Sequence, residues 1–307
     1  MMDYSNISDD KIGAVIVLYN PDIPQLVKSL RVLEQSVGLL CIVDNSKESH
    51  KSELQNFKTV KYISLMENRG IAAAQNVGVK TLKALGVEYV VFSDQDSVAD
   101  KAAVARLISA YRQLRNKGIN VGGVGTRAIN VETGQPYRSK SKEYETIFVD
   151  EGSETTKTTR CSYIRSSISL IPITLFGVVG GFDESLFIDG VDNEWCWRAN
   201  TMGCQFFIVE NATITHHLGE GDHKIANRNV AISSTFRIYF QFRNYLWLCR
   251  RNYVPHWWKR IHLFKYVVKI VYYPLFVSPR MAFAKCICKG IIDGVTKKDK
   301  PRFERIY

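Results

Sequence analysis

The sequence predicts an α/β fold with a mostly parallel, doubly wound sheet and a helical region at the carboxyl end. Short apolar runs rich in branched residues alternate with segments of helical periodicity through the first hundred residues. Polar and acidic residues close several of these runs, and beyond residue 222 the chain becomes basic and aromatic. A length of 307 residues fits one large α/β domain with an appendage.

The first apolar run, residues 12–19, predicts a buried strand that ends at a turn formed by Asn20 and Pro21. Residues 23–37 carry leucines at helical spacing, which predicts a helix with one apolar face. A second buried strand is expected at residues 39–43. The order strand, helix, strand indicates a parallel sheet.

A third short strand is expected at residues 61–65, followed by a helix over residues 71–86 with several small side chains. Such side chains let a helix approach a ligand or another backbone closely. The start of this helix at Gly70, with Arg69 beside it, is therefore a candidate diphosphate site. Tight packing of an alanine-rich helix is the alternative. Residues 122–125 are rich in glycine and predict a loop. Residues 138–159 are polar and predict either a lid or a disordered insertion.

The apolar run at residues 89–92 predicts a fourth buried strand, and it is followed by two carboxylates one residue apart, Asp94 and Asp96. Ligands of α/β sheets gather at the carboxyl ends of the strands. Two acidic side chains at that edge suit Mg²⁺ or Mn²⁺, which fill their other positions with phosphate and water. A polar turn without a ligand is the alternative.

Asp44 closes the second strand, where a carboxylate can accept hydrogen bonds from a nucleotide base or ribose. A helix cap or turn explains its position equally well. No G-x-G-x-x-G motif follows the first strand, so the sequence gives little support to a nicotinamide or flavin cofactor.

The seven cysteines form an odd set without zinc-type pairs, which favours reduced thiols. The first eleven residues lack a basic segment followed by an apolar one, so no secretory signal is expected. Both observations favour a cytoplasmic protein.

The motifs VIVLYNP, VDNS, ENRGIAAAQNVG and SDQDS, in this order, resemble the nucleotide half of family-2 glycosyltransferases, which are inverting enzymes of GT-A fold. Downstream, GGFDESLFIDGVDNEWCWRA and THHLGEG are similar to the acceptor half of these enzymes, above all of rhamnosyltransferases in bacterial O-antigen and surface polysaccharide synthesis. The resemblance spans residues 11–221. It implies a catalytic domain at residues 1–222, with a nucleotide half at 11–100 and an acceptor half at 101–222. Residues 223–307 form the remaining region.

The resemblance also implies roles for individual residues. Asp192 would be the catalytic base, with Asp189 and Glu194 as stand-ins because the family's usual Glu-Asp pair is replaced by Val191 and Asp192. Asp96 would bind Mn²⁺ or Mg²⁺, together with Asp94 and with His216, which is favoured over His217. Residues expected to bind the donor are Asp44, Asn45, Asn68, Arg69, Gly70, Asn76, Asp94 and Gln95. Residues expected to bind the acceptor are Asp189, Glu194 and Trp195.

The implied donor is dTDP-L-rhamnose, with nucleotide-linked galactose, glucose or N-acetylglucosamine as alternatives. The implied acceptor is a lipid-linked glycan or an oligosaccharide. A different enzyme class remains open, because Asp94 after four apolar residues also resembles the nucleophile motif of haloacid-dehalogenase-like phosphatases. A catalytically silent protein that binds the membrane surface is a third hypothesis.

The carboxyl-terminal region predicts a contact with the membrane surface. Residues 236–276 contain 14 aromatic residues interleaved with lysine and arginine, and no run of eighteen apolar residues. Such alternation suits the interface of an anionic membrane rather than its core. Helices that brace the catalytic domain or a second subunit, as in a homo-oligomer, are the alternative. No nucleic-acid module is recognisable, so nucleic acid is not expected as a partner.

Overall fold

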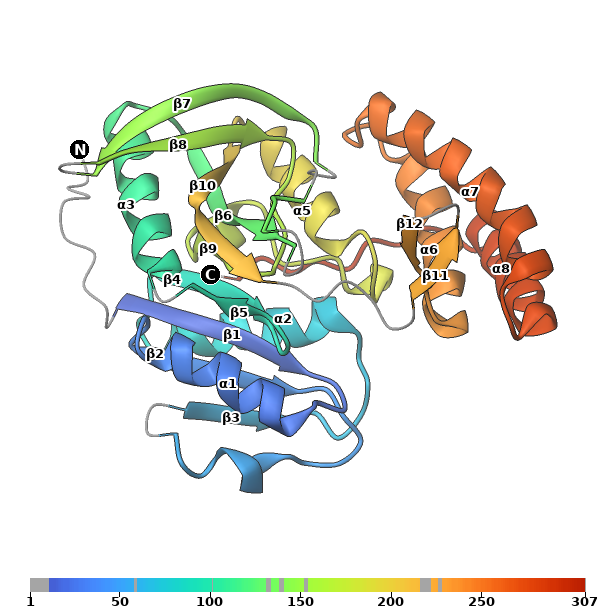
Figure 1. Cartoon of the computed structure of the whole chain (residues 1–307), viewed down its shortest axis with the longest axis horizontal. Coiled ribbons are helices and arrows are strands. Elements are labelled where there is room, and N and C mark those ends of the chain that lie inside the picture. The colour runs from blue at the N-terminus through green and yellow to red at the C-terminus, as the bar shows by residue number, and fades with distance from the viewer. Residues whose placement is uncertain are drawn as a thin grey trace.

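The computed structural model describes residues 11–57, 60–100, 102–130, 134–137, 141–151, 154–215, 222–225 and 228–306. A twisted sheet with helices on both faces forms one body, and three long helices from the end of the chain stand beside it (Figure 1).

The first part of the chain forms the parallel arrangement that the sequence predicts. Its elements are β1 (Ile12–Leu18), α1 (Ile23–Glu34), β2 (Leu39–Asp44), the short 3-10 helix η2 (Lys51–Leu54), β3 (Val60–Ser64), α2 (Ile71–Ala84) and β4 (Tyr89–Asp94). Strand β1 lies between β2 and β4, β2 also pairs with β3, and all three pairs are parallel. Most side chains of β1, β2 and β4 are buried, as expected for a sheet covered on both faces.

The rest of the sheet is mixed. Its elements and the helices between them are β5 (Val98–Ala99), α3 (Ala103–Asn116), β6 (Val121–Ile129), β7 (Glu143–Glu151), β8 (Glu154–Cys161), β9 (Ser169–Pro172), α4 (Leu175–Val178), η3 (Glu184–Leu186), α5 (Val191–Asn200) and β10 (Gln205–Thr215). Strand β9 runs antiparallel between β4 and β6 and thereby joins the two parts. The strand order is β3-β2-β1-β4-β9-β6-β10-β8-β7, with β5 on β10.

The glycine-rich stretch at residues 122–125 lies inside β6, so an expectation of a loop there is wrong. Two of these glycines, Gly122 and Gly123, make room for neighbouring strands. A Cβ atom on Gly122 would lie 2.7 Å from the ring of Phe206, and one on Gly123 would lie 2.9 Å from the carbonyl oxygen of Leu170. The missing side chains therefore permit close strand packing rather than a turn.

The expectation of an irregular segment at residues 138–159 is also wrong, since β7 and β8 form an antiparallel hairpin that joins the sheet through β10. Arg127 on β6 anchors this polar hairpin. Its guanidinium binds Glu143 on β7 at 2.7 Å and Glu210 on β10 at 2.6 Å. Polar residues thus form strands here because charged partners from distant segments satisfy them.

The core lies on both faces of the sheet. Ala14 and Ile16 of β1 pack on one side with Leu30 of α1, while Val15 packs on the other side with Val79 of α2. This alternation follows from the two-residue period of a strand. Both faces of β1 are therefore dry, and polar chemistry is confined to the strand ends.

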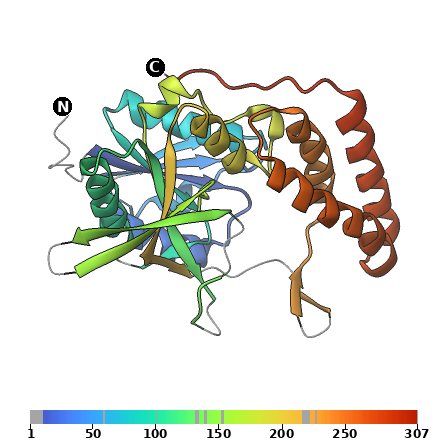
Figure 2. The same cartoon turned by 90° about the horizontal axis from the view of Figure 1, so that it is seen from above.

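The carboxyl-terminal region contains a small hairpin and three helices. These elements are β11 (Asp222–Ile225), β12 (Arg228–Ala231), α6 (Thr235–Arg250), α7 (His256–Phe276) and α8 (Arg280–Thr296). After α8 the chain runs back along the body that holds the sheet (Figure 2). The amide of Ile306 donates to the carbonyl of Phe176 at 3.0 Å, so the tail is fastened next to α4.

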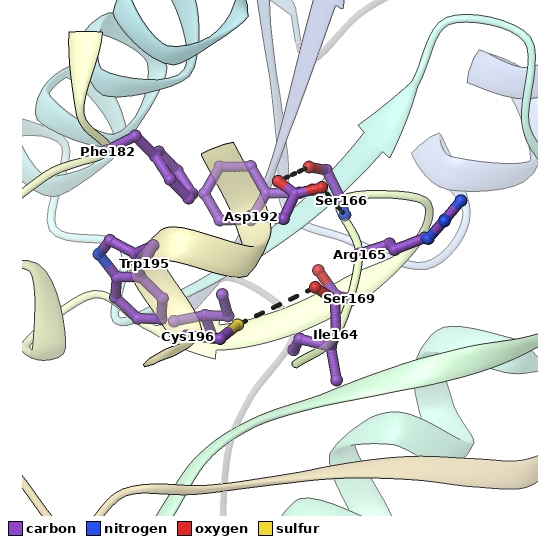
Figure 3. Close-up of a pocket in the computed structure, with 10 residues that line it drawn as sticks. Ile164, Arg165, Ser166, Ser169, Phe182, Asp192, Trp195 and Cys196 are labelled. Atoms are coloured by element: carbon purple, nitrogen blue, oxygen red, sulfur yellow. Dashed lines mark hydrogen bonds between the residues drawn. The ribbon is translucent and has the colours of Figure 1, made fainter. Parts of the chain in front are cut away.

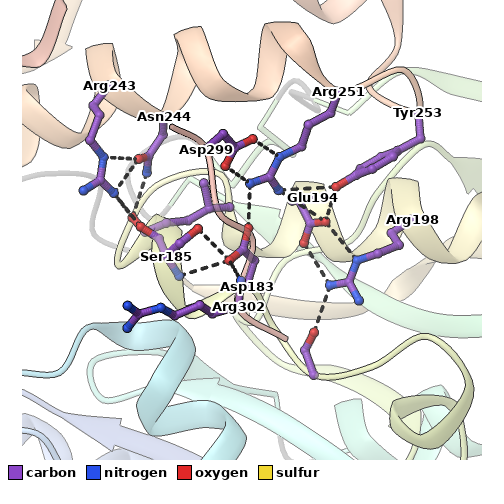
Figure 4. A network of polar contacts seen from close by, with 12 residues as sticks. Asp183, Ser185, Glu194, Arg198, Arg243, Asn244, Arg251, Tyr253, Asp299 and Arg302 are labelled. Atoms are coloured by element: carbon purple, nitrogen blue, oxygen red, sulfur yellow. Dashed lines mark hydrogen bonds and ion pairs between the residues drawn. The ribbon is translucent and has the colours of Figure 1, made fainter. Parts of the chain in front are cut away.

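A buried ion-pair network joins α5, α6 and the tail (Figure 4). Arg251, directly after α6, contacts Asp183 and Asp299, each at 2.7 Å. Arg198 binds Glu194 at 2.9 Å within α5. Buried charges are tolerated only when they are paired in this way. The network therefore fixes α5 relative to the carboxyl-terminal helices.

Candidate active site

The carboxyl ends of β1, β2 and β4 lie at one edge of the sheet, because the strands are parallel and in register. Polar side chains tie the loops that follow these strands. The amide of Asn20 donates to Ser46 Oγ at 2.9 Å, and the amide of Tyr19 donates to Gln95 Oε1 at 2.8 Å. Gln95, predicted to bind the donor, thus holds the loop after β1 in this structure.

Asp44 is fully buried at the end of β2 and already accepts several hydrogen bonds. Its donors are the amides of Ser46 and His50 at 3.0 Å, the ring of His50 at 2.9 Å and the hydroxyl of Tyr62 at 2.5 Å. Burial alone would raise the pKa of the Asp44 carboxyl, but these hydrogen bonds hold it below its ordinary value. Asp44 therefore stays ionised and shapes the loop at residues 45–50.

Asn45 joins this loop to the segment before α2. Its Nδ2 donates to Asn68 Oδ1 at 2.9 Å, and its Oδ1 accepts from the amide of Arg69 at 2.8 Å. Asn68 Oδ1 also accepts from the amide of Gly70. Three predicted donor-binding residues, Asn45, Asn68 and Gly70, thus form one connected unit at the sheet edge, with the half-exposed Arg69 side chain beside them.

Gly70 has a positive φ of 83°, and a Cβ atom there would collide with Phe187. The next amide, Ile71, donates to the carbonyl of Phe187 at 2.8 Å. The start of α2 is therefore fastened to the loop that leads into α5. Asn76 makes a second link, because its amide binds both the amide and the carbonyl of Phe182. The structure places Asn76 in the interior, 3% exposed, so its predicted donor contact remains a prediction.

Asp94 and Asp96 occupy the end of β4. Asp94 is half-buried and accepts a hydrogen bond from the Ser167 hydroxyl. Asp96 is exposed, and its backbone carbonyl accepts from Gln25. In the described part of the chain, no group of three or more His, Cys, Asp or Glu side chains is arranged to hold a metal ion. Two carboxylates at an open edge still suit a cation that takes its other ligands from phosphate and water.

Asp192 lies at the start of α5 and lines a small pocket (Figure 3). Ser166 holds it twice, with its hydroxyl on Oδ1 at 2.5 Å and its amide on Oδ2 at 3.3 Å. Burial raises the pKa of the Asp192 carboxyl, the Ser166 hydrogen bonds oppose this rise, and the charge of Asp94 adds to it. A carboxylate with a raised pKa is a stronger base than an ordinary one.

Behind Ser166 stands Gln75, which is 2% exposed on α2 and donates from Nε2 to Ser166 Oγ at 3.0 Å. This bond leaves the serine proton for Asp192. Gln75 Oε1 is buried and has no hydrogen-bond partner among the described residues. Gln75, Ser166 and Asp192 therefore form a directed chain of hydrogen bonds.

The turn at residues 165–168 brings the two acidic groups together. Ser166 holds Asp192 and the next residue, Ser167, holds Asp94. Thr126 of β6 anchors this turn through the carbonyl of Ser167, and Ile168 adopts a positive φ of 56°. A branched residue rarely adopts this conformation, which indicates that the turn is over-determined by its surroundings.

Sequence reasoning missed Arg165, Ser166 and Ser167. Arg165 is exposed, lines the same pocket and lowers the pKa of Asp192 through its charge. Among the described residues it has no hydrogen-bonded or ionic partner. Only the run Ile-Arg-Ser-Ser before a buried strand hinted at this turn, and such a run is common.

The predicted acceptor residues lie in different surroundings. Asp189 is partly exposed and forms an ion pair with Arg237 of α6 at 2.8 Å. Glu194 is fully buried in the ion-pair network. Trp195 is fully buried, stacks on Phe176 at 4.9 Å and forms an inner wall of the pocket. His216 and His217 lie outside the described residues.

Comparisons with known proteins identify the family to which this fold and site belong. The sequence model described as Glycosyl transferase family 2 matches residues 14–169. The chain is 33% identical over 252 residues to the dTDP-rhamnosyl transferase RfbF of Shigella flexneri, which covers 80% of this chain and 82% of that protein. It is 22% identical over 243 residues to the low-salt glycan biosynthesis hexosyltransferase Agl10 of Haloferax volcanii, covering 76% of this chain and 74% of that protein.

A crystal structure of S. aureus TarS 1-349, which is of GT-A type, matches with a TM-score of 0.53 over 93% of this chain and 81% of that chain. The sequence identity is 12%, so this likeness shows the fold alone. The family match covers half of the chain and includes the turn that holds Asp94 and Asp192. The chain therefore belongs to glycosyl transferase family 2 and is a glycosyltransferase of GT-A fold, related to rhamnosyltransferases.

Proposed function

We propose that this glycosyltransferase is an inverting rhamnosyltransferase of bacterial surface polysaccharide synthesis. It transfers L-rhamnose from dTDP-L-rhamnose to a hydroxyl group of a lipid-linked glycan or an oligosaccharide. The observation that carries the proposal is one turn with two neighbouring serines. Ser166 binds Asp192 and Ser167 binds Asp94, so the two carboxylates are held close together. A nucleotide sugar bound at the Asp94 edge then lies beside a half-buried carboxylate, as a direct displacement requires.

The donor is chosen from the relative named a dTDP-rhamnosyl transferase, which matches four fifths of this chain. Nucleotide-linked galactose, glucose and N-acetylglucosamine are the alternatives. Family membership sets the phosphatase hypothesis and the silent binding protein aside, because the match begins at residue 14 and extends well beyond Asp94.

In the proposed reaction, Asp192 takes the proton of the acceptor hydroxyl while the acceptor oxygen attacks the anomeric carbon. The bond from that carbon to the phosphate oxygen breaks, and its electron pair remains on the diphosphate. Attack from the opposite face inverts the anomeric centre, so one base suffices. No covalent sugar intermediate is needed, in contrast to retaining glycosidases. Ser166 orients the base, with Gln75 fixing the direction of the serine hydroxyl.

The diphosphate needs positive charge nearby. Enzymes of family 2 generally use a divalent metal ion. We assign Asp96 and Asp94 as the residues that would hold Mn²⁺ or Mg²⁺, with His216 as a further ligand. The bound ion would supply charge that stabilises the departing diphosphate. Arg69 at the start of α2 and Arg165 beside Asp192 add cations of the protein itself.

The remaining donor contacts follow the connected unit at the sheet edge. Asp44 would contact the nucleobase by accepting a further hydrogen bond on a carboxylate oxygen that already accepts one within the chain. Asn45, Asn68 and Gly70 would form the wall around the nucleotide. On the acceptor side, Asp189 would border the approach to Asp192, and Trp195 would form the inner wall of its pocket. We further infer that the enzyme works as a peripheral protein on the cytoplasmic face of the membrane, where a lipid-linked acceptor is presented.

Donor binding is the first test. Purified protein is heated with dTDP-L-rhamnose or with the UDP-linked forms of glucose, galactose and N-acetylglucosamine, each with and without Mn²⁺. A donor at a hundred times its dissociation constant adds about 2.7 kcal/mol to the free energy of unfolding. We expect the largest shift for dTDP-L-rhamnose with Mn²⁺. A larger shift for a UDP-sugar would replace the proposed donor, and no shift for any would contradict the proposal.

A further inference from the structure

Helix α7 carries an unusual outer surface. Nine of its large apolar side chains are exposed, and Phe264 is 72% exposed. Ile261, Phe264, Val268, Val271 and Leu275 follow one stripe at spacings of three and four residues. We call the nine exposed side chains the apolar face of α7. A surface helix normally turns polar residues outward, so this face is arranged for a partner rather than for water.

The opposite side of α7 already has its contacts within the chain. Trp258 and Tyr273 are buried, and Tyr266 packs against Tyr245 of α6 with ring centroids 4.6 Å apart. Lys269 binds Gln241 of α6. The helix is therefore docked on its aromatic side, and its apolar face points away from the protein. In Figure 2, α7 runs outward from the body that holds the sheet, and α8 forms the far edge of the molecule.

Exposed cations lie on α7 itself and on the next helix, α8. Arg260 and Lys265 of α7, and Arg280 and Lys285 of α8, are exposed. Within the described residues, none of these four forms a hydrogen bond or an ion pair. Helix α7 contains no acidic residue, and the single one in α8, Asp293, binds Tyr239, Lys289 and Lys297. Residues 224–307 contain 18 Lys and Arg against 3 Asp and Glu, a balance of +15.

This charge decides between two occupants of the face. A second copy of the chain in a two-fold contact would bring the same unpaired cations together without any acid to balance them. An anionic lipid surface offers acyl chains for the apolar face and negative headgroups for the cations. No described helix is long and apolar enough to cross a membrane, so α7 would lie along the surface.

We propose that the apolar face of α7, together with the exposed cations Arg260, Lys265, Arg280 and Lys285, docks the protein onto an anionic lipid bilayer. The inference deepens the proposed membrane location and rests on that part of the proposed function. It does not depend on Asp192 or on the donor. Each cation near such a surface is expected to raise the partition coefficient about fivefold.

The test is sedimentation with vesicles of phosphatidylcholine, with and without phosphatidylglycerol. The full chain is expected to sediment with anionic vesicles and to be released by high salt. A triple variant with Phe264→Ser, Val268→Ser and Val271→Ser should lose at least tenfold in binding. Lys265→Glu should weaken binding to anionic vesicles. Phe148→Ser, which removes an exposed aromatic ring from β7, is the matched control and should bind like the original chain.

Three results would overturn the proposal. The full chain could remain in the supernatant, or the triple variant could bind vesicles as well as the original chain does. Light scattering could also show that the original chain is an oligomer and the triple variant a monomer. The last result would assign the face to a second copy. The thermal shift with dTDP-L-rhamnose is measured on the same variants. The apolar face is remote from the donor residues. If the triple variant keeps its thermal shift with dTDP-L-rhamnose but no longer binds vesicles, the result supports docking independently of the proposed reaction.

Discussion

Helix α5 carries two acidic residues, Asp192 and Glu194, that are only two positions apart in sequence but lie in different chemical surroundings. Glu194 is fully buried, yet Arg198 and Arg251 contact it and Tyr253 donates to it at 2.7 Å. Asp192 is half-buried and held by Ser166, with its pKa raised by burial. A carboxylate balanced by cations stabilises a structure, whereas one left without a contacting cation is ready to accept a proton.

The largest effect is expected for Asp192→Asn. The amide keeps the shape of the side chain but cannot take a proton. Transfer of rhamnose from dTDP-L-rhamnose to a membrane lipid extract should fall by about 10²- to 10⁴-fold. The thermal shift with the donor should persist. Asn193→Asp, a neighbouring change on the same helix, serves as the control. Normal turnover by Asp192→Asn would remove this residue from the proposed role.

Glu194→Ala should act on stability. The change leaves Arg198 buried without the carboxylate that pairs with it, whereas Arg251 keeps Asp183 and Asp299, and the cost is about 3–5 kcal/mol. Denaturant unfolding followed by circular dichroism measures this loss. Glu304→Ala is the control, because its ion pair with Lys80 is exposed and contributes little. Equal stability of the two variants would refute the contrast between the carboxylates of α5.

Ser166→Ala tests the chain of hydrogen bonds. The serine hydroxyl stabilises ionised Asp192, so its removal should raise the pKa of that carboxyl further. The acidic limb of the pH–rate profile should therefore move to higher pH, with about a tenfold loss of rate at neutral pH. Ser166→Thr retains a hydroxyl and should retain the profile. An unchanged profile in Ser166→Ala would assign the serine a packing role only.

Arg165→Ala should have the smallest effect of the series. Arg165 is exposed and acts on Asp192 only through its charge, so the acidic limb should move slightly in the same direction. The Michaelis constant for the donor should rise a few fold if the cation also contacts the diphosphate. Arg165→Lys keeps the charge, so its Michaelis constant and acidic limb should lie between those of the original chain and of Arg165→Ala. A Michaelis constant that does not change would exclude the diphosphate contact.

The sequence predicted the parallel strands and the acidic residues at their ends, because branched apolar runs and helical spacing are local signals. The contrast between Asp192 and Glu194 was not predictable. Both are acidic residues of one motif, and their partners come from Ser166, Arg251 and Tyr253, far away in the chain. The same reason explains why a loop was predicted within β6. Its glycines are needed because Phe206 and Leu170 of distant strands pack against them, and this packing cannot be read from the local sequence.

The stereochemistry of the product tests the central claim most directly. If Asp192 acts as the single base in a direct displacement, proton NMR should show rhamnose attached with the anomeric configuration opposite to that in dTDP-L-rhamnose. A product with the donor's configuration would require a second displacement at the same carbon and would contradict the account.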